Sequence, residues 1–248
     1  MSLPTVSVVI PTYNEAKNLP DLLQRVKAAL EGRAEYEIVI ADDRSPDGTA
    51  DQAVSLGEAL TIPLRVVSRE PPRSLSLSVI EGAKAAGFGC VVVMDADLSH
   101  DPRGILELIT AVKSGECDVA VASRYADGGG IGDWPLWRRA LSVAGTRIAR
   151  ALSRARDPLS GFFACRRALL TGEVELRPKG YKILLELLAR GGDLRVKEIP
   201  TWFEDRRRGA SKLRLRQEIE FLSQVFSLIL LRFGKLISSH SQSRRLVS

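Results

Sequence analysis

Short runs of β-branched apolar residues alternate with helix-length amphipathic stretches through the first half of the chain. The apolar runs are Val6–Ile10, Glu37–Ala41, Leu64–Val67, Val91–Met94 and Asp118–Ala122. The stretches between them predict helices at Leu19–Leu30, Thr49–Ala59, Ser76–Ala86 and Pro102–Ser114. Strands that are apolar along their whole length must be covered on both faces. The alternation therefore predicts an α/β fold in which helices flank a mostly parallel sheet.

The second half of the chain is less regular. Its predicted elements are helices at Trp137–Leu152, Lys182–Arg190 and Leu215–Ile237, and strands at Phe162–Cys165 and Leu194–Ile199. The glycine cluster Gly128–Gly130 is predicted to be a mobile loop. Since no internal repeat and no linker divides the chain, we expect one domain over residues 1–214, followed by an amphipathic helix and a polar tail over 215–248.

The composition suits an anionic partner and reduced thiols. Lys and Arg outnumber Asp and Glu by 36 to 30, and the net charge of +6 favours nucleotides, phosphates or lipid headgroups. Cys90, Cys117 and Cys165 lack metal-ligand spacing, and their odd number argues against a disulfide framework. No signal peptide is recognisable, and no apolar run reaches the roughly 18 residues that span a bilayer. We therefore expect a soluble or peripheral protein.

Polar side chains follow four of the predicted strands at the point where each strand ends. These segments are Pro11–Glu15, Asp42-Asp43, Asp95-Ala96-Asp97 and Ser123-Arg124. In a parallel α/β sheet, such carboxyl ends line the ligand crevice. Each segment alone has a structural explanation, such as a helix cap at Asn14 or a turn at Asp42. Their convergence at one edge of the sheet favours a functional site.

Asp95-Ala96-Asp97 is the most informative of these segments. Hard divalent cations prefer carboxylate oxygens, and Mg²⁺ commonly takes one or two protein carboxylates together with substrate phosphates. Two aspartates one residue apart, at the end of an apolar strand, match that need. A metal there would stabilise charge on a diphosphate leaving group. A pair of solvated loop acids is the alternative, and Asp101-Pro102 is predicted to cap a helix.

Three segments resemble the nucleotide-sugar half of family-2 inverting glycosyltransferases, which have the GT-A fold, a Rossmann-like sheet flanked by helices. They are VSVVIPTYNEAKNLPDLL (residues 6–23), EIVIADDRSPDGTAD (37–51) and VVVMDADLSHDP (91–102). Later segments are similar to the dolichol-phosphate mannose synthases of that family, namely ASRYADGGGIGDWPLWRRALS (122–142), DPLSGFFACRR (157–167) and FEDRRRGASKLRL (203–215). The resemblance implies a catalytic domain that transfers mannose from GDP-mannose, with inversion, to a dolichyl or polyprenyl phosphate.

The resemblance also implies roles for individual residues. The donor would contact Pro11, Tyr13, Glu15, Asp42, Asp43, Asp95, Ala96, Asp97, Arg124, Arg206 and Lys212. The acceptor phosphate would contact Arg124, Trp134, Arg138 and Ser142. Mg²⁺ or Mn²⁺ would bind Asp95 and Asp97, and the catalytic residues would be Asp97, Arg124 and Arg138. On a helix, Arg138 and Ser142 lie one turn apart, so both can reach one phosphate.

Two positions depart from the family pattern. The loop Arg69–Ser76 lacks the glycines that this family often has there, and Ser99 stands where some relatives have a third side chain near the metal. His100 is interpreted as a structural or metal-proximal residue and not as a general base. A phosphate monoester, whose second pKa is about 6, is already mostly a dianion at pH 7, so the acceptor supplies its own nucleophile.

The C-terminal region suggests a surface partner. Basic residues concentrate in Asp205–Arg216, and the apolar segment Ile219–Ile237 is interrupted by polar residues. Both features favour peripheral attachment to the cytoplasmic face of a membrane, or docking on small membrane-embedded subunits. Nucleic-acid binding fits the charge alone, and because no recognition motif accompanies the charge, we do not expect it.

Three other functions stay open at this point. A UDP-glucose-dependent polyprenyl-phosphate glucosyltransferase, or another family-2 glycosyltransferase, would have the same motifs, because contacts to the sugar lie in variable loops. A nucleotidyltransferase would carry a glycine- and basic-rich triphosphate loop near the first strand, and PTYNEAKNL is not such a loop. A non-catalytic binding module is disfavoured by the intact Asp95 and Asp97 with Arg124 and Lys212.

Overall fold

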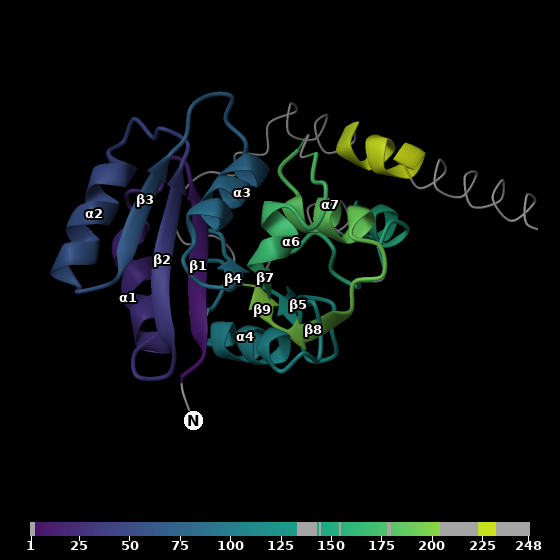
Figure 1. Cartoon of the computed structure of the whole chain (residues 1–248), viewed down its shortest axis with the longest axis horizontal. Helices are drawn as coiled ribbons and strands as arrows, with labels where there is room; N and C mark the ends of the chain where they lie inside the picture. The colour runs from purple at the N-terminus through teal and green to yellow at the C-terminus, as the bar shows by residue number, and fades with distance from the viewer. Residues whose placement is uncertain are drawn as a thin grey trace, which may run out of the picture.

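The computed structural model describes residues 3–132, 143, 145–153, 155–177, 180–203 and 223–231. Helices cover both faces of a seven-stranded sheet (Figure 1). The strands are β1 (Thr5–Thr12), β2 (Glu35–Asp42), β3 (Leu64–Ser68), β4 (Cys90–Val93), β5 (Val119–Ser123), β6 (Gly130–Ile131), β7 (Phe163–Arg166), β8 (Val196–Pro200) and β9 (Trp202–Phe203). The predicted α/β fold with a mostly parallel sheet is confirmed.

The helices of the first half begin and end close to their predicted bounds. They are α1 (Leu19–Leu30), α2 (Thr49–Ala59), α3 (Leu75–Ala85), the 3₁₀ turn η1 (Pro102–Gly104) and α4 (Ile105–Lys113). In the second half, α7 (Ile183–Arg190) agrees with the helix predicted at Lys182–Arg190, and the short helix α6 (Arg167–Thr171) was not predicted. Residues 145–150 and 223–231 are also helical. The other parts of the helices predicted at Trp137–Leu152 and Leu215–Ile237 lie mainly outside the described residues.

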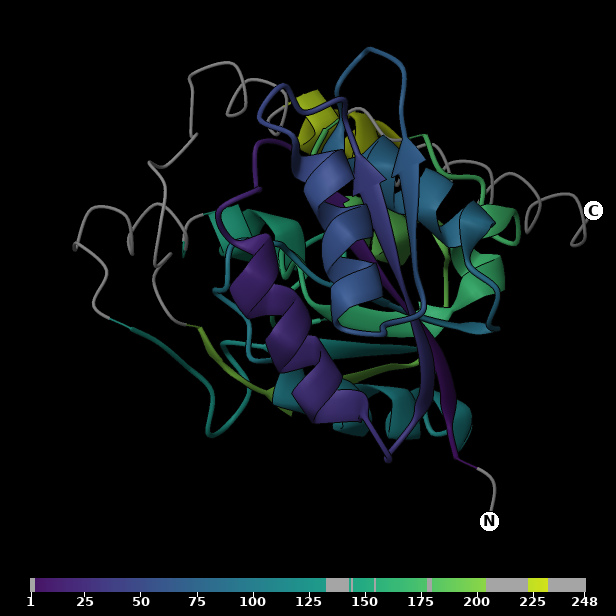
Figure 2. The same cartoon turned by 90° about the vertical axis from the view of Figure 1, so that its left-hand side faces the viewer.

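Helix α1, the purple helix on the side of the sheet that faces the viewer in Figure 2, illustrates why these stretches are helical. Leu19, Leu22, Leu23, Val26 and Leu30 recur at helical spacing and are all fully buried. Pro20 and Asp21 occupy its first turn, where a missing N–H and a negative charge are both favourable. The predicted cap at Asp101 is also confirmed, because its side chain accepts a hydrogen bond from the amide of Arg103 as η1 begins.

The strand order is β3-β2-β1-β4-β7-β5-β8. Every pair in this sheet is parallel except those of β7, which is antiparallel to both β4 and β5. Strand β7 therefore enters the sheet where its two neighbours end. As a result, the residues that precede β7 lie at the same edge as the ends of β4 and β5, which we call the carboxyl edge.

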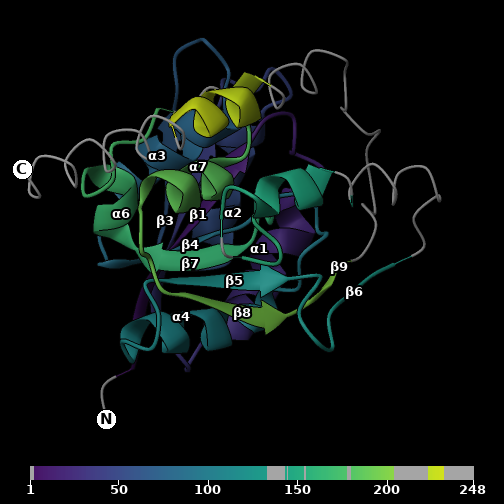
Figure 3. The same ribbon diagram turned by 90° about the vertical axis from the view of Figure 1, so that its right-hand side faces the viewer.

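Two hydrophobic cores hold the layers together. Val8, Ile40, Leu22 and Leu108 belong to the core between the sheet and α1, α2 and α4. On the other face, α3, α6 and α7 cover a second core, as Figure 3 shows with these helices above the sheet and α4 below it. A third cluster joins residues 145–152 and 223–231 to Leu185 of α7. The C-terminal helical residues thus pack onto the domain through Val225 and Leu228.

The glycine cluster was predicted to be a mobile loop, and that prediction was wrong for Gly130. This residue starts β6, which pairs with β9 in a separate two-stranded sheet. A Cβ atom on Gly130 would lie 2.2 Å from the Trp202 ring, so glycine is what permits the close approach of the two strands. Strands as short as β6 and β9 carry no periodicity that a sequence could reveal.

The cysteines agree with their predicted state. Cys90, Cys117 and Cys165 are free and buried. Burial raises the pKa of Cys90 to about 11, which keeps the thiol protonated at neutral pH. Within the described part of the chain, no helix has both the length and the apolar character needed to cross a bilayer.

Candidate active site

The loops that follow β1, β2, β4 and β5 meet at the carboxyl edge, toward which β5 and β8 point in Figure 3. Three of these loops contain a non-glycine residue in the left-handed region, namely Asn14 (φ 57°), Arg44 (φ 52°) and Leu98 (φ 63°). Such residues are uncommon, and they cluster at functional sites because the surrounding contacts must hold them. The backbone therefore marks this edge independently of the side chains.

Asp42 joins the first loop to the second. Its carboxylate accepts hydrogen bonds from the hydroxyl of Thr12 at 2.8 Å and from the amide of Ser45 at 2.7 Å. The hydroxyl of Ser45 also donates to Asp42 and accepts from the amide of Asn14. Only 1% of Asp42 is exposed, so its carboxylate acts as an internal brace between the two loops.

Asp43 joins the second loop to the third in the same way. It forms a buried ion pair with Arg69. It also accepts hydrogen bonds from the amide of Ser74 at 2.9 Å and the hydroxyl of Ser78 at 2.8 Å. Arg73, from the same loop, lies over the Tyr13 ring with its guanidinium carbon 4.2 Å from the ring centroid. The predicted donor contacts of Pro11, Tyr13, Glu15, Asp42 and Asp43 stay predictions.

The acidic segment after β4 has different surroundings. Oδ1 of Asp97 accepts hydrogen bonds from the hydroxyl and, at 3.1 Å, the amide of Ser99, while the Asp95 side chain is 31% exposed. Ala96 between them is buried in the core. A Cβ atom on Gly161 would lie 2.3 Å from Oδ2 of Asp95, so the chain that enters β7 passes directly beside this carboxylate. Asp95 is therefore a partly exposed carboxylate at the carboxyl edge, and Asp97 is oriented by Ser99.

Arg124 is held by a residue that the sequence analysis did not single out. Asp157, which is fully buried, accepts hydrogen bonds from Nε of Arg124 at 2.8 Å, Nη2 at 2.7 Å and the backbone amide at 3.0 Å. Burial alone would lower the pKa of Arg124, but the hydrogen bonds and charge of Asp157, with smaller contributions from Tyr125 and Asp95, raise it. The guanidinium is therefore a fixed positive charge near Asp95.

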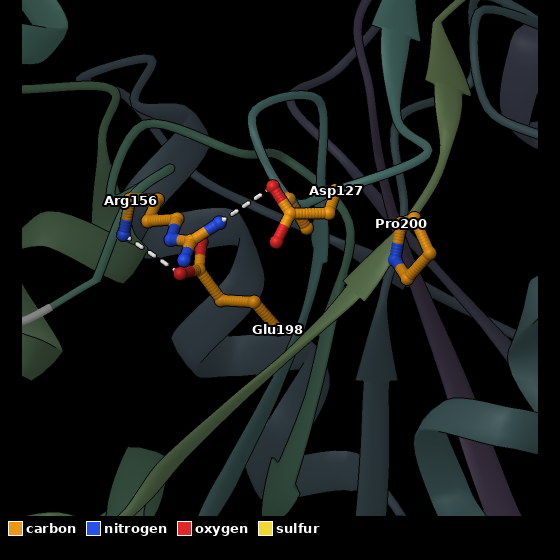
Figure 4. Close-up of a pocket in the computed structure, with 5 residues that line it drawn as sticks. Asp127, Arg156, Glu198 and Pro200 are labelled. Carbon is orange, nitrogen blue, oxygen red and sulfur yellow. Dashed lines mark hydrogen bonds and ion pairs between the residues drawn. The ribbon is translucent and has the colours of Figure 1, made fainter.

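Glu198 of β8 holds the backbone of the segment that carries Asp157. Its carboxylate accepts hydrogen bonds from the amides of Arg156 and Asp157, each at 2.8 Å. Figure 4 shows the surface hollow beside these contacts, in which the Arg156 side chain reaches Asp127 at 3.2 Å. The chain from Arg156 to Gly161 is thus hydrogen-bonded to β8 at one end and passes directly beside the Asp95 carboxylate at the other.

Five predicted site residues lie outside the described residues: Trp134, Arg138, Ser142, Arg206 and Lys212. Their roles at the donor and acceptor phosphates stay predictions. Phe203 immediately precedes the basic segment in the sequence. The centroid of its ring lies 5.5 Å from the guanidinium carbon of Arg124.

Four residues of this edge were missed: Asp157, Gly161, Glu198 and Arg69. Asp157 and Gly161 lie in DPLSGFFACRR, a segment that contributed only to the family resemblance. The signal available for Asp157 was an acid directly before a proline and a strand. Arg69 lies in the loop that departs from the family pattern. No local pattern connects Arg69 to Asp43 or Glu198 to Asp157.

Comparison with known proteins identifies the family. Residues 7–171 match the model of Glycosyl transferase family 2. The chain belongs to this family. Curated relatives of this glycosyltransferase include proteins named dolichol-phosphate mannosyltransferase from Pyrococcus furiosus, at 44% identity over 90% of this chain, and from Saccharomyces cerevisiae, at 34% over 92%. A polyprenol monophosphomannose synthase from Mycolicibacterium smegmatis is 35% identical over 83%.

The coverage of these relatives differs. The glycosyltransferase spans 63% of the length of the Pyrococcus furiosus protein, 88% of the yeast protein and 80% of the mycobacterial one. Among solved structures, glucosyl-3-phosphoglycerate synthase from Mycobacterium tuberculosis with Mn²⁺ and UDP-glucose matches with a TM-score of 0.66 at 22% identity, over 93% of this chain and 79% of that one. Mannosyl-3-phosphoglycerate synthase from Rubrobacter xylanophilus has a TM-score of 0.60 at 18% identity, over 96% and 75%. These structures show the shared GT-A fold.

Proposed function

We propose that this glycosyltransferase transfers mannose from GDP-mannose to a dolichyl or polyprenyl phosphate. The observation that carries the proposal is the meeting of Asp95, Asp97 and the fixed Arg124 at one edge of a GT-A sheet, in a chain whose relatives bear mannosyltransferase names. The paired aspartates suit a diphosphate donor, and the positive charge suits a phosphate. The names of the relatives supply the sugar and the lipid.

The residues at this edge fit a divalent cation, Mg²⁺ or Mn²⁺. Asp95 and Asp97 offer hard oxygen ligands, and the Asp95 side chain is 31% exposed. Within the described residues, no group of three or more His, Cys, Asp or Glu side chains could hold a metal ion. The protein would therefore supply two carboxylates, and the remaining ligands would be diphosphate oxygens and water. When bound, the cation would neutralise charge that develops on the leaving diphosphate.

The chain's own residues would orient the two substrates. Ser99 fixes the Asp97 carboxylate, and Asp157 fixes the Arg124 guanidinium near Asp95. Arg124, together with Arg138 and Ser142, would hold the acceptor phosphate in line with the anomeric carbon. Because that phosphate is mostly a dianion at pH 7, no side chain has to remove a proton. Catalysis then consists of positioning and charge stabilisation.

We also propose that the protein works at the cytoplasmic face of a membrane as a peripheral enzyme. Phe226 and Leu230 are 62% and 56% exposed on one side of the helix at 223–231, and Ile148 is 46% exposed. Val225 and Leu228 on the same helix are buried. The exposed side of the helix can therefore contact a membrane while the buried side stays packed against the domain. The net charge of +6 favours an anionic leaflet.

A donor panel tests the reaction. Purified protein is given GDP-mannose, UDP-glucose or UDP-N-acetylglucosamine, each radiolabelled, with a short polyprenyl phosphate and Mg²⁺ or Mn²⁺. We expect label in the lipid phase with GDP-mannose, and none when EDTA is in excess. Transfer from UDP-glucose alone would reassign the donor, and transfer unaffected by EDTA would contradict the metal site.

Vesicle co-sedimentation tests the membrane proposal. We expect binding to anionic vesicles that weakens with salt, and weaker binding of a Phe226→Ser/Leu230→Ser variant. Val54, which is 47% exposed on α2, gives a matched control as Val54→Ser. If wild-type protein binds no vesicles at low salt, recruitment would need a membrane-embedded subunit.

A further inference from the structure

His100 is a buried histidine beside the acidic pair. Its side chain is 3% exposed, and neither Nδ1 nor Nε2 has a hydrogen-bond partner. A neutral imidazole carries one donor and one acceptor nitrogen, and leaving both unsatisfied in the interior is destabilising. Native proteins rarely retain such a group unless it serves a site. The position of the ring indicates which site that is.

The ring points toward Asp95. Nε2 of His100 lies 3.4 Å from Oδ2 of Asp95, close to but not within a well-aligned hydrogen bond. Two aromatic rings hold the imidazole there: Phe162 at a centroid distance of 5.2 Å, and Phe203, packed edge-on, at 5.1 Å. Both neighbours belong to segments at the carboxyl edge, directly before β7 and at the end of β9. The histidine is thus packed so that a small adjustment completes the bond.

The same carboxylate oxygen is restricted from the other direction. A side chain at Gly161 would come within 2.3 Å of Oδ2, so the backbone before β7 limits where this oxygen can move. Carboxylates that bind a cation are commonly held by a second protein group, which fixes their orientation. Contacts of this kind are often long in a free enzyme and shorten when the ligands bind.

We propose that His100 positions Asp95 for the cation. Its Nε2–H donates to Oδ2 of Asp95 when cation and nucleotide diphosphate bind, and this bond holds the carboxylate in its ligating orientation. The inference rests on the proposed function, because it requires Asp95 to be a metal ligand. His100 is a positioning residue in this scheme and does not itself touch the metal.

Mn²⁺ binding in the presence of GDP tests the proposal without any transfer reaction. The free Mn²⁺ signal in electron paramagnetic resonance gives the dissociation constant for the full chain. His100→Phe keeps an aromatic ring against Phe162 and Phe203 but removes the donor. Loss of a group that orients a metal ligand typically weakens affinity about 10- to 100-fold, and we expect that weakening here. An affinity within about twofold of wild type would overturn the proposal.

Two amide variants, His100→Gln and His100→Asn, distinguish the loss of the Nε2–H donor from a general change in packing. They also test the proposal if His100→Phe does not fold. The amide of His100→Gln can reach the position of Nε2, whereas that of His100→Asn reaches only the position of Nδ1. We expect His100→Gln to bind Mn²⁺ nearly as wild type does and His100→Asn to bind it about 10-fold more weakly. Equal losses in both would overturn the proposal. His240→Phe controls for weak Mn²⁺ binding by the second histidine of the sequence.

Electron spin-echo spectroscopy of the Mn²⁺–GDP complex separates positioning from ligation. If His100 were a ligand, the wild type would show a strong Mn²⁺–nitrogen coupling that is lost in His100→Gln. We expect no such coupling, and observing it would contradict the proposed role. Suppose that the wild type transfers mannose and binds Mn²⁺, and that the His100 variants bind Mn²⁺ as tightly as the wild type does. That outcome refutes this inference and leaves the proposed function intact. Wild-type protein that binds no Mn²⁺ with GDP refutes the metal site of the proposed function as well.

Discussion

The acidic pair at the end of β2 and the acidic pair after β4 both lie at the carboxyl edge of the sheet, yet their surroundings differ. Asp42 and Asp43 are 1% and 7% exposed, and they accept hydrogen bonds from Thr12 at the end of β1 and from Ser74 in the loop after β3, respectively. The Asp95 side chain is 31% exposed. Asp97 is buried, and Oδ1 of its carboxylate accepts hydrogen bonds from the amide and hydroxyl of Ser99, two residues further along the chain. Two nearby acids close to a strand end can therefore either hold neighbouring loops together or stay accessible to a ligand.

The difference has a physical origin in the partners that each pair meets. Arg69 ends up buried against Asp43, and an uncompensated buried guanidinium would be costly, so that carboxylate is committed to the fold. The Asp95 side chain lies beside His100 and the backbone of Gly161, and it is 31% exposed. It therefore stays accessible to a ligand, and the pair after β4 is the one that we expect to bind a cation.

The largest expected effect is at the pair after β4. Asp97→Asn keeps the size of the side chain and an oxygen that can accept from Ser99, but it removes the charge. We expect sugar transfer to fall to background, while the free energy of unfolding in urea changes by less than about 1 kcal/mol. A well-folded Asp97→Asn protein with normal transfer would remove the distinction between the two pairs.

The pair after β2 should respond in the opposite way. Asp43→Ala leaves Arg69 buried without its partner, and we expect a loss of about 3–5 kcal/mol in unfolding free energy. The double variant Asp43→Leu/Arg69→Met removes both charges and should recover most of that loss. Urea denaturation of both proteins measures the effect. A loss below about 1 kcal/mol for Asp43→Ala would mean that Asp43 is not a brace.

A third substitution asks whether Arg138 binds the acceptor phosphate and not the donor. Arg138→Lys replaces a planar, bidentate donor with a point charge. We expect kcat/KM for the polyprenyl phosphate to fall about 10-fold, the equivalent of about 1.4 kcal/mol. The Kd of GDP-mannose, measured by calorimetry, should be unchanged. Arg139→Lys is the adjacent control, and equal losses in donor binding and transfer would place Arg138 at the donor.

The smallest effect concerns Asp101, the next acid after the pair. Its side-chain hydrogen bond with Arg103 lowers its pKa in the folded protein below the unfolded value of about 3.9. The ionised carboxylate is therefore stabilising above about pH 4, and the stabilisation is lost as the pH falls through the folded pKa. Because the pair is largely exposed, Asp101→Asn should cost only about 0.5 kcal/mol at pH 7. Urea unfolding at pH 7 and below pH 4 should show the difference shrinking.

Sequence periodicity was sufficient for the first half of the fold. The strands around Val8, Ile40 and Val92 are apolar along their length, and helices such as α1 have a clear buried face, so local pattern and tertiary packing agree. The direction of β7 was not predictable, because the four residues Phe163–Arg166 read the same in either orientation. Its antiparallel placement depends on β4 and β5, which lie far away in the sequence.

The residues of the candidate site also differ in how far local sequence could predict them. Asp95 and Asp97 could be singled out as candidates because both acids lie within one short segment. Asp157 and Arg124 are 33 residues apart, and the amides that Glu198 holds are more than 40 residues away from it. No local pattern encodes such pairs, and only the three-dimensional arrangement brings them together.

The position of β7 also has a consequence for biosynthesis. Strand β4, which precedes the acidic pair Asp95 and Asp97, pairs with β1 on one side and with β7 on the other. As the chain leaves the ribosome, the first four strands can assemble before Phe163 has been made. At about 5–20 residues per second, the roughly 70 residues between β4 and β7 take about 4–14 s to add. During that interval β4 is an unprotected sheet edge that can pair with another chain, so slow translation of this stretch would favour misassembly of nascent protein.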